Sequence, residues 1–299
     1  MEKKNQPGRP KKNKTILKTD FPGNLNKPQY EGAINEIRIS ESCVLIQYLK
    51  TFKTLKVNDL DIYFLPEKFV IKASIDNRLN GGIGGDKNIY VEIKKNNVYS
   101  YYCSKPAMIH IKSIINLESL MEEIDENTKF LDIFVTNISN ILSYRTHDET
   151  NDIVTESSID AEYIQYNFPE LCLQCPEDVR ISVLGYKPSD LKKIFNKKIR
   201  KKCYCKLKAK NNVINMDFVP EVGKITKITI NANNTREIKS YDMDLYEINL
   251  PKTDVNQFMM HVKEDVSLYF SDKALFMQNE IGGLSLSYII PIKIEKNIG

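Results

Sequence analysis

One arrangement repeats four times along this sequence: a segment with apolar residues at helical spacing, then two short strand-like runs separated by a turn. Helical segments are expected at residues 40–55, 111–125, 188–201 and 253–264. The strand runs that follow them are 60–65 and 69–75, then 130–136 and 141–145, then 203–209 and 213–219, and finally 266–271 and 275–280. Four helices among so many strands predict an α+β architecture of two similar domains, each with two helix-plus-β-hairpin units.

The spacing of the four copies predicts where the chain divides. The helical segments begin near residues 41, 111, 188 and 253, so the gap between the second and third copies is the longest and leaves room for a linker. We therefore expect a basic arm over residues 1–32, a first domain over 33–160, a linker over 161–179 and a second domain over 180–299.

The N-terminal arm carries the basic excess of the chain. Residues 1–30 hold eight Lys and Arg against two acidic residues, whereas the other 269 residues hold 35 against 37. Such an arm, rich in Lys, Asn, Pro and Gly, is expected to be disordered and to bind a polyanion, most simply nucleic acid. Residues 7–12 read Pro-Gly-Arg-Pro-Lys-Lys and resemble an AT-hook, so Arg9, Lys11 and Lys12 are candidate contacts in an A·T-rich minor groove. The alternatives are a solvated basic tail and a nuclear-import signal.

Several features predict an intracellular protein without a membrane partner. No stretch approaches the roughly 18 apolar residues of a membrane-spanning helix. The charged N-terminus lacks the apolar core of a secretory signal. Six cysteines in a long, Lys-rich chain without such a signal are expected to be free thiols in a reducing compartment.

Residues suited to catalysis or to a cofactor show no recognisable grouping. The three histidines are scattered, and none has an acid or nucleophile partner nearby in the sequence. Cys172, Cys175, Cys203 and Cys205 could form a four-thiolate zinc site, but 27 residues separate the two pairs and the second pair has C-x-C spacing. The glycine-rich segment 81–85 lacks the lysine of a phosphate-binding loop. We therefore expect no enzyme activity, no cofactor and no metal site.

Three short segments carry a family resemblance. Residues 288–295 read Tyr-Ile-Ile-Pro-Ile-Lys-Ile-Glu, residues 165–170 read Gln-Tyr-Asn-Phe-Pro-Glu, and Lys-Pro-Ser at 187–189 precedes the third helical segment. They resemble, in that order, the closing motif, the interdomain linker motif and the start of the third helix in sliding clamps of the PCNA family. The resemblance covers residues 35–295. The arm and the 81–85 insertion depart from cellular clamps, so the chain looks most like the divergent clamps of large DNA viruses.

The resemblance implies a function without a chemical reaction. A clamp is a homotrimeric ring that encircles duplex DNA, with helices lining its interior. It acts as a processivity factor for DNA polymerase and as a docking platform for replication and repair proteins, in the nucleus or in a cytoplasmic viral replication factory. The alternative is a DNA-bound scaffold or viral transcription factor that keeps the clamp fold and is anchored by its AT-hook-like arm.

The resemblance also implies a set of DNA-contacting residues on the helices. With apolar side chains packed on the sheets, the basic side chains project toward the DNA and contact its phosphates without reading sequence. Beside the three arm residues, the candidates are Lys50, Lys53, Lys112, Lys193, Lys197, Arg200, Lys201, Lys252 and Lys263. The alternative is that these lysines are simply solvated.

Two protein-binding surfaces follow from the same resemblance. A hydrophobic pocket for short partner peptides is expected from Leu65, Phe69, Val70, Tyr166, Phe168, Ala274, Tyr288, Ile290 and Pro291. Subunits are expected to pair through edge strands at 152–160 and 223–231, which bring Ile153, Thr155, Ile225, Ile228 and Ile230 to the interface. The alternative for Tyr166 and Phe168 is that they staple the linker to the domains.

Overall fold

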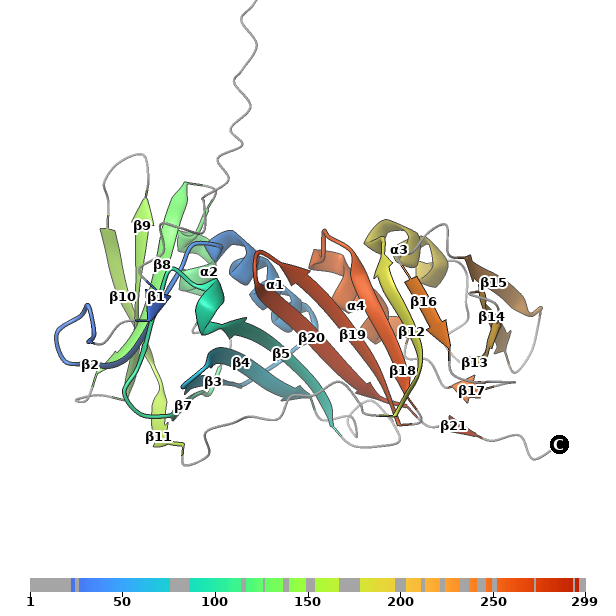
Figure 1. Cartoon of the computed structure of the whole chain (residues 1–299), viewed down its shortest axis with the longest axis horizontal. Helices are drawn as coiled ribbons and strands as arrows, with labels where there is room; N and C mark the ends of the chain where they lie inside the picture. Colours follow the sequence, from blue (N-terminus) through green and yellow to red (C-terminus); the bar gives the residue numbers. More distant parts are fainter. Residues whose placement is uncertain are drawn as a thin grey trace, which may run out of the picture.

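The fold is known from a computed structural model. The structure describes residues 23–24, 27–75, 86–113, 117–125, 127–136, 140–148, 154–166, 178–196, 203–210, 213–220, 224–231, 237–240, 246–248, 252–271, 273–292 and 294–295. The described part is mostly β-structure with a few short helices, as the sequence predicts (Figure 1).

Three sheets form the body of the molecule. The first has the strand order β1(Gly23–Asn24), β6(Ser100–Cys103), β2(Ala33–Ile39), β8(Thr128–Thr136), β9(Ile141–Asp148), β10(Val154–Asp160). The second has the order β11(Glu162–Gln165), β7(Ala107–Ile111), β3(Leu60–Leu65), β4(Lys68–Ile75), β5(Lys87–Lys94), β20(Leu284–Pro291), β19(Ala274–Ile281), β18(Val266–Ser271), β12(Val179–Tyr186), β16(Glu237–Ser240). The third has the order β15(Thr226–Asn231), β14(Val213–Pro220), β13(Cys203–Lys210), β17(Tyr246–Ile248), β21(Ile294–Glu295). Neighbouring strands are antiparallel except β1 and β6.

The described α-helices are α1(Ser42–Thr54), α2(Glu118–Glu123), α3(Pro188–Asn196) and α4(Lys252–His261), and a 3₁₀ turn, η3, covers Lys95–Asn97. The four α-helices lie in a row in the spatial order α2, α1, α4, α3, with α2 beside the six-stranded sheet (Figure 1). In α1 the spacing of Leu45, Leu49 and Phe52 puts all three side chains on one buried face. The same spacing leaves Lys50 and Lys53 exposed.

The second helix is much shorter than the sequence predicts. The expected helix at 111–125 begins only at Glu118, because Ala107, Ile109 and Ile111 alternate as buried residues of strand β7. Ile111 pairs with Leu60 in the sheet. Ile111, where the helix was expected to begin, is therefore the last residue of a strand.

A single ten-stranded sheet joins the two halves of the chain. Strand β5 of the first half pairs with β20 of the second, from Asn88 opposite Ile289 to Ile93 opposite Leu284. Behind this junction the Lys87 ammonium lies 2.9 Å from the Asp254 carboxylate. The same carboxylate accepts a hydrogen bond of 2.9 Å from the Tyr288 hydroxyl. The predicted linker begins as strand β11, paired with β7, and residues 167–177 lie outside the described part. The limits expected from the sequence for the arm, the two domains and the linker stay predictions.

Candidate functional sites

The helix layer presents basic groups where α1, α3 and α4 meet. Lys50 of α1 is exposed, and Lys192 of α3 donates to the Met260 carbonyl near the end of α4 over 3.5 Å. His261 lies in the same region, and its pKa is lowered by burial and by the positive charges of Lys50 and Lys192. Because these positive groups act on one ring, this part of the helix layer is suited to an anion.

Contacts of His261 join helices from the two halves of the chain. Its Nε2 atom lies 2.7 Å from the Thr54 hydroxyl at the end of α1, and the Gln47 side chain donates to its carbonyl oxygen. These contacts hold the C-terminal end of α4 against α1. The basic side chains of both helices are thereby fixed relative to one another.

Two edge strands lie at opposite ends of the molecule. Strand β10 is the last strand of the six-stranded sheet, and β15 is the last strand of the five-stranded sheet (Figure 1). Among the described strands each is paired on one side only, so its other side offers backbone N–H and C=O groups to a further strand. Large apolar side chains are exposed at both edges: Val154 is 55% exposed, and Ile225, just before β15, is 51% exposed.

The two edges carry opposite charge. Strand β10 contains Glu156 and Asp160 and no basic residue, whereas the segment 224–231 contains Lys224 and Lys227 and no acidic residue. Ile159, Ile228 and Ile230 point into the core, so Glu156, Asp160 and Lys227 lie on the faces turned away from it. Joining the two edges would bring Lys227 to the same face of a shared sheet as Asp160 and as Glu156, whose carboxylate also pairs with Arg145 of β9 at 2.6 Å.

The structure separates the predicted interface residues. Thr155 and Ile225 are exposed at the edges, whereas Ile228 and Ile230 are 8% and 0% exposed and face the core. Ile228 and Ile230 face the core because successive residues of a strand point to opposite faces, which puts these two residues on the same face. Only their backbone groups remain for a neighbouring strand. Ile153 lies outside the described residues.

An apolar patch covers part of the face of the ten-stranded sheet that is turned away from the helices. The outer patch consists of five buried residues, Tyr63, Leu65, Val70, Tyr90 and Phe276, and of the partly buried Met108, Tyr166, Tyr269 and Ile289 packed against them. The rings of Tyr63 and Tyr166 meet edge to face with centroids 5.3 Å apart. The predicted residues Leu65, Val70 and Tyr166 therefore come together here.

Three other residues predicted for the partner pocket lie on the opposite face. Phe69, Tyr288 and Ile290 are buried in the main core on the helix side, and the Tyr288 hydroxyl bonds to Asp254 of α4. Ile289 takes the outward position on β20, because Tyr288 and Ile290 alternate with it. Ala274 pairs with Pro291 at the end of this sheet, and Phe168 lies outside the described residues.

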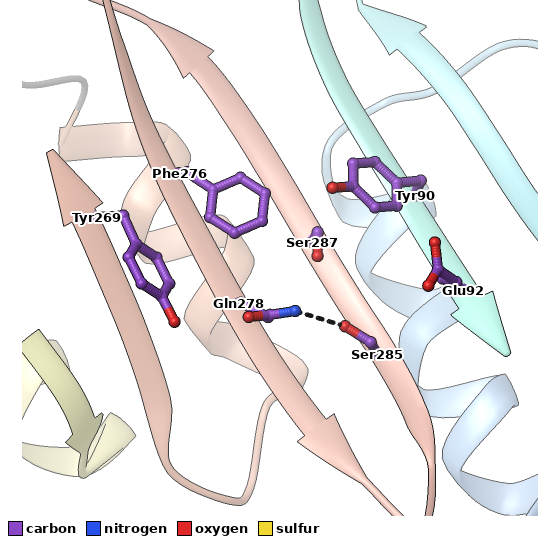
Figure 2. Close-up of a pocket in the computed structure, with 7 residues that line it drawn as sticks. All are labelled: Tyr90, Glu92, Tyr269, Phe276, Gln278, Ser285 and Ser287. Carbon is purple, nitrogen blue, oxygen red and sulfur yellow. Dashed lines mark hydrogen bonds between the residues drawn. The ribbon is translucent and has the colours of Figure 1, made fainter. Parts of the chain in front are cut away.

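A pocket of about 180 Å³ opens beside the outer patch. Its lining comes from both halves of the chain: Tyr90 and Glu92 of β5, Tyr269 of β18, Phe276 and Gln278 of β19, and Ser285 and Ser287 of β20. Figure 2 shows Ser287 between the rings of Tyr90 and Phe276. The Gln278 side chain donates to the Ser285 hydroxyl over 3.0 Å.

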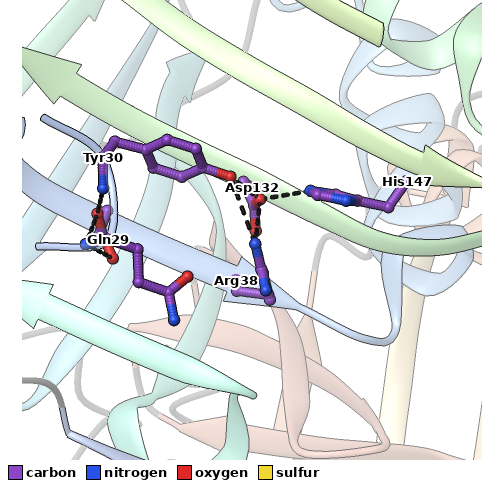
Figure 3. Close-up of polar contacts among 6 residues, drawn as sticks. Gln29, Tyr30, Arg38, Asp132 and His147 are labelled. Carbon is purple, nitrogen blue, oxygen red and sulfur yellow. Dashed lines mark hydrogen bonds and ion pairs between the residues drawn. The ribbon is translucent and has the colours of Figure 1, made fainter. Parts of the chain in front are cut away.

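A polar network fastens the segment that precedes β2 onto the six-stranded sheet (Figure 3). Asp132 accepts two bonds from Arg38, at 2.6 and 2.8 Å, and lies 2.7 Å from His147 Nε2. The Tyr30 hydroxyl also bonds to Asp132. Burial and Asp132 raise the pKa of Tyr30 to about 12, so its phenol stays a donor at neutral pH. We infer that this network has a structural role, because it ties Tyr30, which precedes β2, to Asp132 of β8.

The arrangement of sheets and helices has a counterpart among solved structures. Comparison with known protein families gives no match, and comparison with curated protein sequences gives none. The crystal structure of Proliferating Cellular Nuclear Antigen from Entamoeba histolytica aligns with 87% of this chain and 99% of its own, with a TM-score of 0.64 and 13% identity. The chain has a PCNA-like clamp fold. The expected α+β, PCNA-like fold is thereby confirmed, whereas the two similar domains and the disordered arm stay predictions. An identity of 13% shows a likeness in fold alone.

In this PCNA-like fold the predicted DNA-contacting residues have different surroundings. Lys50, Lys112 and Lys263 are exposed. Lys53 pairs with Glu118 at 2.5 Å and Lys193 with Asp190 at 3.0 Å, and both lysines are more than half exposed. Lys252 is the first residue of α4. Arg9, Lys11, Lys12, Lys197, Arg200 and Lys201 lie outside the described residues.

The PCNA-like fold also adds residues that the sequence did not single out. Lys192 was not among the DNA candidates, although it neighbours Lys193, because its place against α4 depends on a helix contact that no local pattern encodes. Phe276 and Tyr269 could have been found from their alternation with core residues on β19 and β18. Among the described residues, no group of three or more His, Cys, Asp and Glu could hold a metal ion. No described helix is long and apolar enough to cross a membrane.

Proposed function

We propose that this chain is a PCNA-like sliding clamp: a homotrimeric ring that encircles duplex DNA, confers processivity on a DNA polymerase and docks replication and repair proteins. The observation that carries the proposal is the pair of edge strands at opposite ends of the molecule, with opposite charges. In this role the chain performs no reaction and needs no cofactor. It acts where DNA is replicated, in a nucleus or a viral replication factory.

Ring closure follows from a head-to-tail contact. Strand β10 of one subunit pairs with β15 of the next, which covers the exposed edges and the apolar side chains of Val154 and Ile225. A contact between two different surfaces makes a closed ring when its rotation closes. Two β10 edges, both acidic, would repel one another, so the charges favour the head-to-tail pairing over a two-fold one. The number of three subunits is what the sequence resemblance to PCNA-family clamps implies.

The helix layer would face the DNA. Lys50, Lys192 and Lys263, with His261, would make weak phosphate contacts that let the ring slide. Topology, rather than affinity, would keep the ring on DNA. Arg9, Lys11 and Lys12 of the arm would add a further contact that depends on salt.

The outer patch would dock partner proteins. Over the buried Tyr63 and Val70, the partly buried Tyr166 and the exposed Ile164 of the short edge strand β11 offer an apolar surface where an extended apolar peptide could lie. Polymerase and other replication or repair proteins would carry such peptides.

The first experiment is the solution mass, by light scattering behind a sizing column at moderate salt and several concentrations. We expect a stable mass near three times 34.6 kDa. Retention on nicked circular DNA, with loss after the circle is cut, would then identify a ring that encircles DNA. A monomer at every concentration would overturn the ring. DNA binding that then depends on Arg9 would identify the arm-anchored scaffold instead.

A further inference from the structure

The pocket beside the outer patch is lined by hydroxyls, an amide and a carboxylate, all of which can accept hydrogen bonds. Ser287 is 1% exposed, and its hydroxyl has no hydrogen-bond partner within the described part of the chain. Gln278 uses its amide nitrogen to donate to Ser285, which leaves its carbonyl oxygen for a ligand. The Glu92 carboxylate reaches the pocket from the first half of the chain, with one oxygen 2.9 Å from the Lys68 ammonium. An occupant with several N–H donors would satisfy these acceptors.

Aromatic rings form the walls of this pocket. Tyr90 and Phe276 stand on either side of Ser287, and Tyr269 lies 5.5 Å from Phe276, ring centroid to centroid (Figure 2). Aromatic faces attract cations, and a planar cation can stack on them. Among the described residues that line the pocket, Glu92 is the only Asp, Glu, Lys, Arg or His. Walls and acceptors together fit a flat positive group.

We propose that this pocket binds the guanidinium group of an arginine side chain, carried by a partner segment that lies on the outer patch. A guanidinium is planar and always charged, and it presents five N–H donors, whereas an ammonium presents three and stacks less well. Tyr90 and Phe276 belong both to the pocket and to the patch, so one extended segment can reach both. The proposal rests on the proposed docking function and adds the chemistry of the partner.

Lys68 makes the proposal testable in two directions. Its ammonium occupies the carboxylate that the arginine would need, so it is an internal competitor. Glu92→Gln removes the negative charge that attracts the guanidinium. It should weaken arginine binding by about five-fold, a loss typical of one charge-assisted hydrogen bond. Lys68→Gln releases the carboxylate and should strengthen binding by about two- to three-fold. A variant that merely disturbed the sheet would weaken binding in both cases.

The experiment uses the full chain with ¹³C-labelled Tyr and Phe rings and the single-residue probe N-acetyl-arginine amide. We expect saturable NMR shifts of Tyr90, Tyr269 and Phe276 with a Kd in the millimolar range, about −4 kcal/mol at 1 mM. N-acetyl-citrulline amide, which has nearly the same shape without the charge, is the matched control and should give none. The Arg9→Gln chain, measured in parallel, shows whether the protein's own arm competes for the pocket.

The outcomes separate this inference from the docking function. No saturable shift up to about 50 mM, equal shifts with citrulline, or unchanged affinity in Glu92→Gln would overturn it. Tighter probe binding in Arg9→Gln would mean that the arm is the natural occupant and would overturn the partner assignment. Docking itself is tested by Ile164→Asp on β11, which is 38% exposed opposite Met108, and this change should abolish binding of apolar partner peptides. The single-residue probe does not need the patch, so either proposal can fail while the other stands.

Discussion

At the scale of single residues, the junction between the two halves depends on Gly283. This glycine lies in the β19–β20 turn at φ +86°, and an added Cβ would approach the Asn97 Cβ to 2.6 Å. Gly283→Ala should lower the free energy of unfolding by about 1 kcal/mol for the left-handed backbone and by about 1 to 3 kcal/mol more for the overlap with Asn97. Urea unfolding followed by circular dichroism measures the change.

A second glycine and a second-site change make the matched controls for Gly283. Gly32 has φ +74° and nothing within 4 Å of an added Cβ, so Gly32→Ala should show the backbone cost alone. Asn97→Gly should recover the additional loss in Gly283→Ala, because it removes the atom that the new methyl meets. Equal losses at the two glycines would show that the contact with Asn97 is easily relieved.

At the scale of elements, the packing of α4 between α1 and α3 predicts a pH dependence of DNA binding. Burial and the charges of Lys50 and Lys192 lower the pKa of His261 in the free protein. Phosphates near the helix layer would favour the charged ring, so binding should take up a proton and tighten as the pH falls. We expect duplex affinity at constant salt to rise about three-fold from pH 7.5 to 6, and His261→Gln to lose this rise.

The control for His261 is the pair of other histidines, which are bound to Asp61 and Asp132 on other faces. His110→Gln should keep the pH dependence. An unchanged profile in His261→Gln would mean that the end of α4 does not approach the phosphates.

The strand alternation shows how much of these elements the sequence could predict. Strands 60–65 and 266–271 were predicted to the residue, because apolar runs there end at clear turn signals. On β20 the alternation of Leu284, Leu286 and Tyr288 with serines predicts that Tyr288 points inward, whereas the resemblance to the clamp closing motif implies a place in the partner pocket. The joining of β5 to β20 could not be predicted, because it pairs residues nearly 200 positions apart and no local pattern encodes it.

At the scale of the whole molecule, the opposite charges at its two ends predict a charge-reversal test of the ring. Lys227→Glu would set one acidic residue of β15 against Asp160 and Glu156 of the next subunit, and should weaken assembly at least about ten-fold. Asp160→Lys in the same chain should restore assembly, because the pair is then reversed rather than lost. Lys208→Glu, exposed on the inner strand β13, should leave assembly unchanged. Sizing of the three variants over a dilution series measures the strength of assembly.

If the double variant assembles no better than Lys227→Glu, β10 and β15 are not partners. If Lys208→Glu weakens assembly equally, net charge rather than edge pairing governs it.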